Sequence, residues 1–137
     1  MKNRFIYAGV LVAMFSLNAA FDLFAFTDKF PSLNATETLT EIEKGGDTLI
    51  LDVRTPQEYT GPLGHLKGAK LLPVDQLGSR LGELEKYRDT KILVVCRSGY
   101  RSRNAARFLV ENGFKDVVNV GPGMQGMSSL SGAPIER

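Results

Sequence analysis

The stretch from residue 91 to residue 113 constrains the fold more than any other part of the chain. Its apolar, β-branched run at residues 92–96 predicts a buried strand. A short polar turn follows, and apolar residues then recur at helical spacing as far as Gly113, a residue typical of a helix C-terminal cap. The sequence therefore predicts a strand, a loop and a helix in direct succession, with Cys96 where the strand ends.

That position has consequences for the chemistry of Cys96, the only cysteine of the chain. Backbone N–H groups of the loop and the positive end of the helix dipole should converge on one small volume. Arg97 and Arg101 add positive charge nearby. Such surroundings bias a thiol toward the thiolate, which is the nucleophilic form. We therefore predict a reactive Cys96 rather than a cysteine that only fills the core.

The rest of the chain alternates strand and helix signals. Buried strands are predicted at residues 48–53 and 117–120, and a short strand at residues 69–72, stopped by Pro73. Helices are predicted from a cap at Asn34 or Thr36 to about residue 44, and in a brief turn from Pro56. Leucines at helical spacing mark residues 74–87, where Gly78 and Gly82 should interrupt or bend the helix.

The two ends of this region carry weaker signals. Residues 26–32 are expected to form a linker or a short edge strand, and residues 121–134 a glycine-rich loop with a short helical turn at most. Met124 and Met127 in that loop are expected to fill the core. Alternating strands and helices predict an α/β fold with a central, mostly parallel sheet covered by helices on both faces.

Two motifs should meet at one edge of this sheet. Cys96 ends one strand, and Asp52 with Arg54 ends another. Because sites in open parallel sheets lie beyond the carboxyl ends of the strands, we expect these residues on the same side of the molecule.

The sequences of both motifs carry a family resemblance. CRSGYRS, residues 96–102, and LDVRTPQEYTGPLGHLKGA, residues 51–69, resemble the active-site loop and upstream segments of single-domain rhodanese-like sulfurtransferases. The resemblance covers roughly the last three-quarters of the chain as one domain, taken as residues 26–137. It implies a three-layer rhodanese-like fold and a cysteine that accepts sulfane sulfur as a persulfide. The donor would be a small sulfur compound such as thiosulfate, and the acceptor cyanide, a thiol or a protein.

The loop after Cys96 is expected to bind the substrate. Arg101 is expected to act on the leaving group, whereas Arg97 could equally be a solvated surface charge. The remaining loop residues should contribute backbone N–H groups more than side chains, and Gly99 a backbone geometry that other residues resist. The predicted binding residues are Arg97, Ser98, Gly99, Tyr100, Arg101 and Ser102.

Four polar residues near the site are expected to be structural. Spacing suggests an ion pair between Arg54 and Glu58, beside Asp52, although the three residues could also form an acid–base set. His65, the only histidine, is expected to be a hydrogen-bonded turn residue, with a general-base role as the alternative. The family often has a tryptophan near Met127, and this chain has none, so the far wall of the pocket should differ.

Two other functions share these features. A cysteine phosphatase of this fold needs an arginine six positions after the cysteine, but here Ser102 holds that position and Arg101 comes one earlier. The shorter loop suits a single terminal sulfur. A persulfide carrier without turnover is not distinguished from an enzyme by loop length.

Residues 1–25 differ in kind from the domain. Lys2 and Arg4 precede an uncharged, largely apolar run at residues 5–20. This pattern predicts an export signal, with an uncleaved membrane anchor as the alternative. The expected location is periplasmic, or anchored to the inner membrane and facing the periplasm.

Composition excludes several functions. With 17 basic and 15 acidic residues the formal net charge is +2, which argues against a nucleic-acid partner. One cysteine and one histidine cannot build a structural zinc site. No metal and no cofactor are expected.

Overall fold

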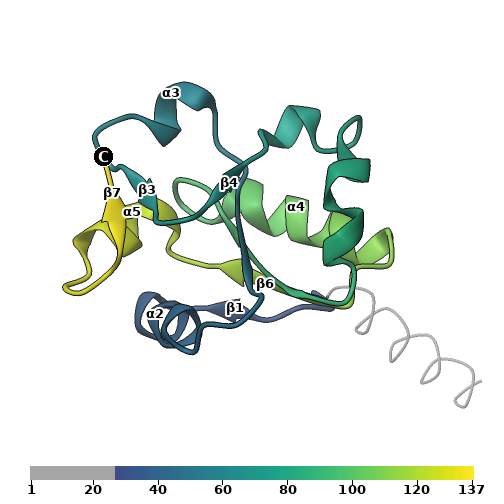
Figure 1. Ribbon diagram of the computed structural model, residues 1–137, viewed down its shortest axis with the longest axis horizontal. Helices are drawn as coiled ribbons and strands as arrows, with labels where there is room; N and C mark the ends of the chain where they lie inside the picture. The colour runs from purple at the N-terminus through teal and green to yellow at the C-terminus, as the bar shows by residue number, and fades with distance from the viewer. Residues whose placement is uncertain (1–26) are drawn as a thin grey trace, which may run out of the picture.

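The computed structural model describes residues 27–137. Within them, a five-stranded parallel sheet has the strand order β1-β6-β5-β2-β4 (Figure 1). Its strands are β1 (Ser32–Leu33), β2 (Leu49–Asp52), β4 (Lys70–Leu71), β5 (Lys91–Val95) and β6 (Asp116–Val120). A separate antiparallel pair joins β3 (His65–Leu66) to β7 (Ile135–Glu136).

Helices cover both faces of the sheet, as predicted (Figure 1). One face packs against α2 (Ala35–Glu43) and α5 (Gly123–Ser129). The other packs against α4 (Tyr100–Glu111) and the 3₁₀ helices η1 (Val74–Gln76) and η2 (Leu81–Tyr87). A short helix, α3 (Pro56–Tyr59), follows β2. The three-layer α/β fold is confirmed.

The apolar run of β5 follows from this layering. Ile92 and Val94 pack toward α4, whereas Leu93 and Val95 pack toward α2 and α5. Successive side chains of a strand point to opposite faces, so a strand covered on both sides must be apolar throughout. The register places Asp52 beside Val95, so the ends of β2 and β5 lie together, as predicted.

Several local predictions are confirmed. Asn34 caps α2 by accepting a hydrogen bond from the backbone N–H of Glu37, whose carboxylate accepts one from the Asn34 N–H in return. The segment at residues 74–87 is divided into η1 and η2 with Gly78 between them, as predicted, whereas Gly82 lies inside η2 and does not interrupt it. An edge strand, β1, also forms and pairs with β6, but it shares only Ser32 with the range predicted for it.

The prediction of a loop at residues 121–134 was wrong, because residues 123–129 form α5. Glycine and serine have weak helix propensity, so the local sequence does not indicate this helix. Tertiary contacts form it instead. Met124 and Met127 are fully buried against the sheet, as predicted for core residues.

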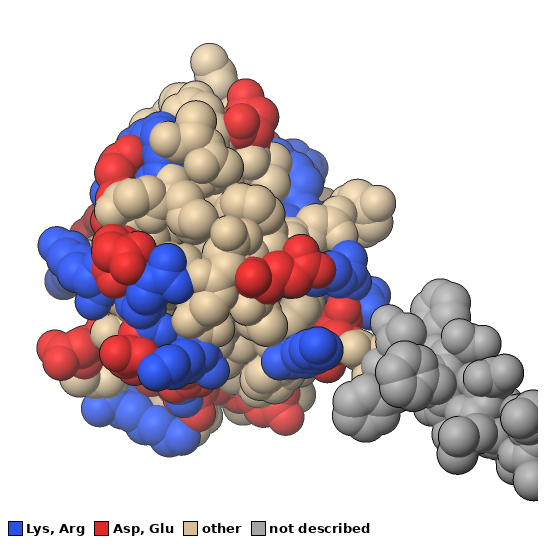
Figure 2. Space-filling view, turned by 90° about the vertical axis from the view of Figure 1, so that its right-hand side faces the viewer, with Lys and Arg blue, Asp and Glu red and all other residues tan. Residues whose placement is uncertain are grey.

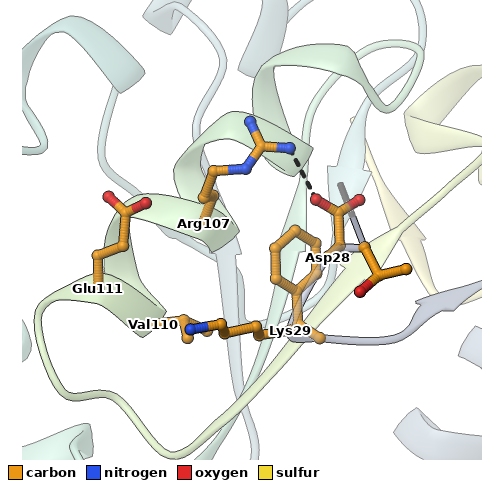
Figure 3. A pocket seen from close by; sticks show the side chains of 7 residues that line it. Asp28, Lys29, Arg107, Val110 and Glu111 are labelled. Carbon is orange, nitrogen blue, oxygen red and sulfur yellow. Dashed lines mark hydrogen bonds and ion pairs between the residues drawn. The ribbon is translucent and has the colours of Figure 1, made fainter. Parts of the chain in front are cut away.

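The segment before β1 is fixed to α4 (Figure 3). Asp28 accepts hydrogen bonds from Arg107 Nη2 at 2.7 Å and from Arg103 Nε at 2.5 Å. Arg103 and Arg107 both lie on α4. Figure 3 shows the Arg107 contact, with Lys29 and Glu111 lining the pocket beside it. The residues leading into β1 are therefore held by the helix that follows the Cys96 loop.

The predicted export signal or anchor at residues 1–25 lies outside the described residues. Within residues 27–137, none of the helices has the length and apolar character needed to cross a membrane. Figure 2 shows one face of the domain, where lysine and arginine side chains alternate with aspartate and glutamate. This face lacks the one-signed charge typical of a nucleic-acid-binding surface.

Candidate active site

Cys96 lies directly after β5, at the base of a loop that leads into α4. Its side chain is 1% exposed. The backbone N–H of Gly99 donates to Cys96 Sγ at 3.1 Å, and the N–H groups of Ser98 and Ser102 also act on the sulfur. The predicted convergence of loop amides and helix N-terminus on Cys96 is therefore present.

The pKa of Cys96 reflects two opposing effects. Burial raises it, because an apolar environment disfavours the charged thiolate. Hydrogen bonds from the Ser102 side chain and from the backbone of Ser102, Ser98 and Gly99 lower it, and together they outweigh burial. The net effect is a pKa below the ordinary cysteine value, which enriches the nucleophilic form.

Gly99 is required by two features of the loop. Its φ of 97° lies in the left-handed region that other residues resist. A Cβ atom at this position would also collide with the carbonyl oxygen of Gly121. The predicted special backbone geometry at Gly99 is confirmed.

The first residues of α5 hold the Cys96 loop through backbone hydrogen bonds. Met124 N–H donates to the Cys96 carbonyl at 2.8 Å, and Gln125 N–H donates to the Arg97 carbonyl at 3.0 Å. In a planar trans peptide the C=O and the next N–H point in opposite directions. Because the Arg97 carbonyl is held toward α5, the Ser98 N–H points the other way, toward the sulfur. The helix that the sequence did not predict thus orients the loop amides.

Ser102 contributes its side chain as well as its backbone, and the expectation of a mainly backbone role was wrong for this residue. Its buried Oγ lies 3.3 Å from Cys96 Sγ and 2.7 Å from Asn119 Oδ1. Asn119 was missed as a site residue. Its sequence signal was a polar residue inside the buried strand β6.

Arg101 and Glu58 form the ion pair beside the loop. Arg101 Nη1 and Nη2 donate to the two carboxylate oxygens of Glu58 at 2.8 and 2.7 Å. The hydrogen bonds from Arg101 lower the pKa of Glu58 to about 2, and the same contact raises the pKa of Arg101. This pair fixes the end of the Cys96 loop to α3.

The predicted ion pair between Arg54 and Glu58 was therefore wrong. Arg54 pairs with Asp52 instead, with Nη2 donating to Oδ2 at 2.7 Å and Nε to Oδ1 at 2.9 Å. Residues two apart in an extended chain project to the same side, which brings Asp52 and Arg54 together. Glu58 lies on α3, and Arg54 precedes the Thr55 cap of that helix.

The Asp52–Arg54 pair is buried and structural, as the sequence indicated for both residues. Arg54 is 1% exposed and Asp52 is fully buried. The remaining donors of Arg54 reach the backbone carbonyls of Glu58 at 3.1 Å and Gly64 at 2.8 Å. One guanidinium therefore ties β2 to both ends of the segment that lies beside the active-site loop.

His65 has a structural environment. Its Nδ1 donates to the Tyr59 carbonyl at 2.9 Å, and its ring stacks on the Tyr59 ring with centroids 3.8 Å apart. Its Nε2 lies 3.3 Å from a carboxylate oxygen of Glu136. Both ring nitrogens are engaged by groups other than Cys96, which confirms the predicted hydrogen-bonded histidine.

The other loop side chains face solvent. Arg97 and Ser98 are exposed, and Tyr100 is 75% exposed. Arg97 lines a pocket of about 190 Å³ with the buried Arg54 and with Leu63 of the preceding segment. Glu58 lines the same pocket, so its wall carries both signs of charge. Among residues 27–137, no group of three or more histidine, cysteine, aspartate or glutamate side chains could hold a metal ion.

Comparison with known proteins agrees with this geometry. The profile of the rhodanese-like domain matches residues 34–130. The chain is 32% identical to the thiosulfate sulfurtransferase GlpE of Pseudoalteromonas translucida, over 79% of this chain and 98% of the relative. It is 34% identical to the putative sulfur carrier protein YrkF of Bacillus subtilis, over 69% of this chain and 49% of the relative.

A solved structure shows the same fold. The rhodanese-like domain protein of Staphylococcus aureus superposes with a TM-score of 0.66 at 29% sequence identity, covering 79% of this chain and all of that protein. The fold, the geometry of the Cys96 loop and the sequence similarity thus indicate the same family. The chain belongs to the rhodanese-like family, which includes relatives named as sulfurtransferases and as a sulfur carrier.

Proposed function

We propose that the domain is a sulfurtransferase that moves sulfane sulfur from a donor such as thiosulfate to a thiophilic acceptor through a Cys96 persulfide. The observation that carries this proposal is the position of Cys96 Sγ, which is buried beneath loop N–H groups at the start of α4. Similarity to a thiosulfate sulfurtransferase supports the choice of donor.

The proposed reaction has two steps. The Cys96 thiolate attacks the outer sulfur of thiosulfate, an S–S bond forms to Cys96, and the S–S bond of thiosulfate breaks to release sulfite. An acceptor such as cyanide then attacks the outer sulfur of the persulfide. Thiocyanate leaves and the Cys96 thiolate is restored. No oxidant or metal takes part in either step.

The loop supplies electrostatic stabilisation in both steps. In the first step negative charge moves from the Cys96 thiolate to the departing sulfite. In the second step negative charge develops again on the Cys96 sulfur as thiocyanate leaves. Loop N–H groups aimed at the sulfur can also hold the outer sulfur of the persulfide anion. Arg101 is proposed to ease sulfite release with the guanidinium N–H groups that Glu58 does not use.

A steady-state assay with thiosulfate and cyanide tests this proposal. The wild-type domain should form thiocyanate over many turnovers, and Cys96→Ser should form none. A wild type that takes up one sulfur atom from thiosulfate but does not form thiocyanate repeatedly would identify a persulfide carrier instead. Similarity to a putative sulfur carrier keeps this second function open.

Phosphatase activity is expected to be negligible. Arg101 is the fifth residue after Cys96, and its guanidinium is paired with Glu58. The loop therefore lacks the length and the arginine position that a phosphoryl group requires. Aryl-phosphate hydrolysis by the wild type that is lost in Cys96→Ser would contradict the sulfurtransferase proposal.

We also propose that the domain acts outside the cytoplasmic membrane, on the basis of the basic and apolar pattern at residues 1–25. Periplasmic sulfur compounds or thiols would then be its substrates. Fractionation of the host followed by N-terminal sequencing tests this location. A shortened periplasmic protein indicates a cleaved signal, and an intact membrane-bound protein indicates an anchor. An intact cytoplasmic protein would contradict export.

A further inference from the structure

A buried polar chain runs from the active-site sulfur to the surface. Cys96 Sγ lies 3.3 Å from Ser102 Oγ, which lies 2.7 Å from Asn119 Oδ1. Asn119 Nδ2 lies 3.0 Å from Ser32 Oγ on the exposed edge strand β1. Asn119 is 3% exposed and Ser102 is fully buried. Below the sulfur, the chain therefore consists of a hydroxyl, an amide and a second hydroxyl.

The hydroxyl of Ser102 has more acceptors than protons. Its single proton can go to Asn119 Oδ1, to the Gly99 carbonyl at 3.1 Å, or to Cys96 Sγ. The Gly99 carbonyl also accepts the N–H of Arg103 at 3.1 Å, so it does not depend on Ser102. The competition is therefore between the Asn119 amide and the sulfur.

The protonation state of Cys96 decides this competition. A thiol can donate its proton to Ser102 Oγ, which leaves the Ser102 hydroxyl to donate to Asn119 Oδ1. A thiolate has no proton to donate; the N–H groups of Ser98, Gly99 and Ser102 already donate to it, and the Ser102 hydroxyl can add a further hydrogen bond. If the Ser102 hydroxyl donates to the sulfur while Asn119 Oδ1 still faces it, Oδ1 loses its donor; if Asn119 presents its NH₂ group instead, Ser102 can donate to the sulfur and accept from Asn119.

Both amide orientations fit their surroundings. The two neighbours of the Asn119 amide, Ser102 and Ser32, are hydroxyls that either donate or accept. If the amide turns over, Nδ2 donates to Ser102 Oγ and Ser32 donates to Oδ1. Each orientation leaves every polar group of the chain with a partner, so neither carries the cost of a buried unsatisfied group.

We propose that Asn119 is a positioning residue for Cys96: its amide turns over when the thiol ionises, and Ser102 changes from an acceptor of the thiol proton to a donor to the thiolate. The thiol proton itself leaves to solvent, and no other covalent bond changes. This inference rests on the proposed function, because it assigns the device that presents Cys96 as the reactive thiolate.

The charged groups around Cys96 do not explain such a coupling. Arg97 and Arg101 lie on the loop and α4, Glu58 of α3 pairs with Arg101, and Asp52 pairs with Arg54. The helix α5 has no charged residue, and the charge of β6, Asp116, pairs in register with Lys91 at the opposite end of β5. None of these groups contacts the Asn119 amide.

The direct test is a pH titration of the isotope-labelled wild-type protein by NMR. The side-chain amide resonances of Asn119 should shift with the same apparent pKa as Cys96, measured by thiolate absorbance. The N–H protons of the Asn119 side chain should lie close to Ser32 at low pH and close to Ser102 at high pH. The side-chain amide of Asn104, exposed on α4, is the internal control and should not follow Cys96. In Cys96→Ser the Asn119 amide should be insensitive to this titration.

A double-mutant cycle provides a second readout. Loss of a hydrogen bond to a charged group corresponds to about one to two pKa units, so Ser102→Ala should raise the Cys96 pKa by that amount. Ser102→Thr should restore it. In an Asn119→Asp background the carboxylate already captures the Ser102 hydroxyl, so Ser102→Ala should raise the pKa by less than half as much. Asn104→Asp is the control for added charge.

Three results would overturn the inference. They are an Asn119 amide that ignores the ionisation of Cys96, contacts that stay with Ser32 at high pH, and an equal effect of Ser102→Ala in both backgrounds. None of these measurements uses a sulfur donor. A domain that fails to transfer sulfur would therefore refute the proposed function while leaving this coupling measurable.

Discussion

Replacing Glu58 with glutamine isolates the ion pair that fixes the active-site loop. Glu58 is the third residue of α3 and completes a capping box with Thr55. Glutamine keeps this capping role but loses the charge that Arg101 binds through two hydrogen bonds. The substitution therefore separates the ion pair from the helix cap.

The expected loss of stability follows from the pKa of Glu58. Arg101, with a smaller contribution from hydrogen bonds of Thr55, holds this pKa at about 2, against an ordinary value of 4.5. At 1.36 kcal/mol per pKa unit the difference corresponds to about 3 kcal/mol. The side chains of Arg101 and Glu58 are 33% and 25% exposed, so solvent screens part of this energy. We expect Glu58→Gln to lower the free energy of unfolding by about 1–2 kcal/mol.

The effect should depend on pH in a defined direction. The folded-state pKa of Glu58 lies below its unfolded value, so the folded state gains stability wherever the carboxylate is ionised in both states. The difference between wild type and Glu58→Gln should be constant above about pH 5 and shrink as the pH falls from about 4.5 toward 2. Chemical denaturation at a series of pH values measures it.

The matched control is Glu37→Gln. Glu37 occupies the same capping-box position in α2, with Asn34 as its partner, but has no arginine across from it. We expect this substitution to change stability by less than about 0.5 kcal/mol. An equal loss in both variants, or a Glu58→Gln loss that persists unchanged at pH 2, would refute the assigned role of the Arg101 pair.

Three further predictions follow from the site. Asp52→Asn should lower the free energy of unfolding by about 3–5 kcal/mol, because it leaves the Arg54 guanidinium buried without its anion; a loss below about 1 kcal/mol in denaturation would contradict that view. Gly99→Ala should abolish sulfur transfer and cost more than about 2 kcal/mol, because of the φ of 97° and the Gly121 carbonyl; near-wild-type activity would show that the loop does not need this geometry. Alkylation of Cys96 should reach half its maximal rate below about pH 8.5, the value for a free cysteine, and Ser102→Ala should move that midpoint upward; a wild-type midpoint above the free value would mean that burial outweighs the hydrogen bonds.

The sequence predicted those parts of the site that depend on neighbouring residues. Cys96, its loop and α4 form one continuous segment, so the strand, the turn and the helix were visible from local patterns. The shared sheet edge of Asp52 and Cys96 followed from the parallel topology. Gly99 was identified because a turn between strand and helix needs a residue that tolerates positive φ.

The parts that were missed depend on contacts between distant segments. The helix α5 forms on glycine- and serine-rich sequence because the Cys96 and Arg97 carbonyls accept its first N–H groups. The Arg54–Glu58 pair was inferred from spacing, but the Arg54 side chain is taken by Asp52 and the Glu58 carboxylate by Arg101, which is 43 positions away. Asn119 lies 17 positions from Ser102, and the packing of α4 against β6 brings them together.

The measurement that tests the central claim most directly is the intact mass of the domain after treatment with thiosulfate and removal of excess reagent. The wild type should gain the mass of one sulfur atom and lose it again on addition of cyanide. Cys96→Ser should gain nothing. A wild type that gains no sulfur, or a Cys96→Ser variant that still does, would contradict sulfur transfer through a Cys96 persulfide.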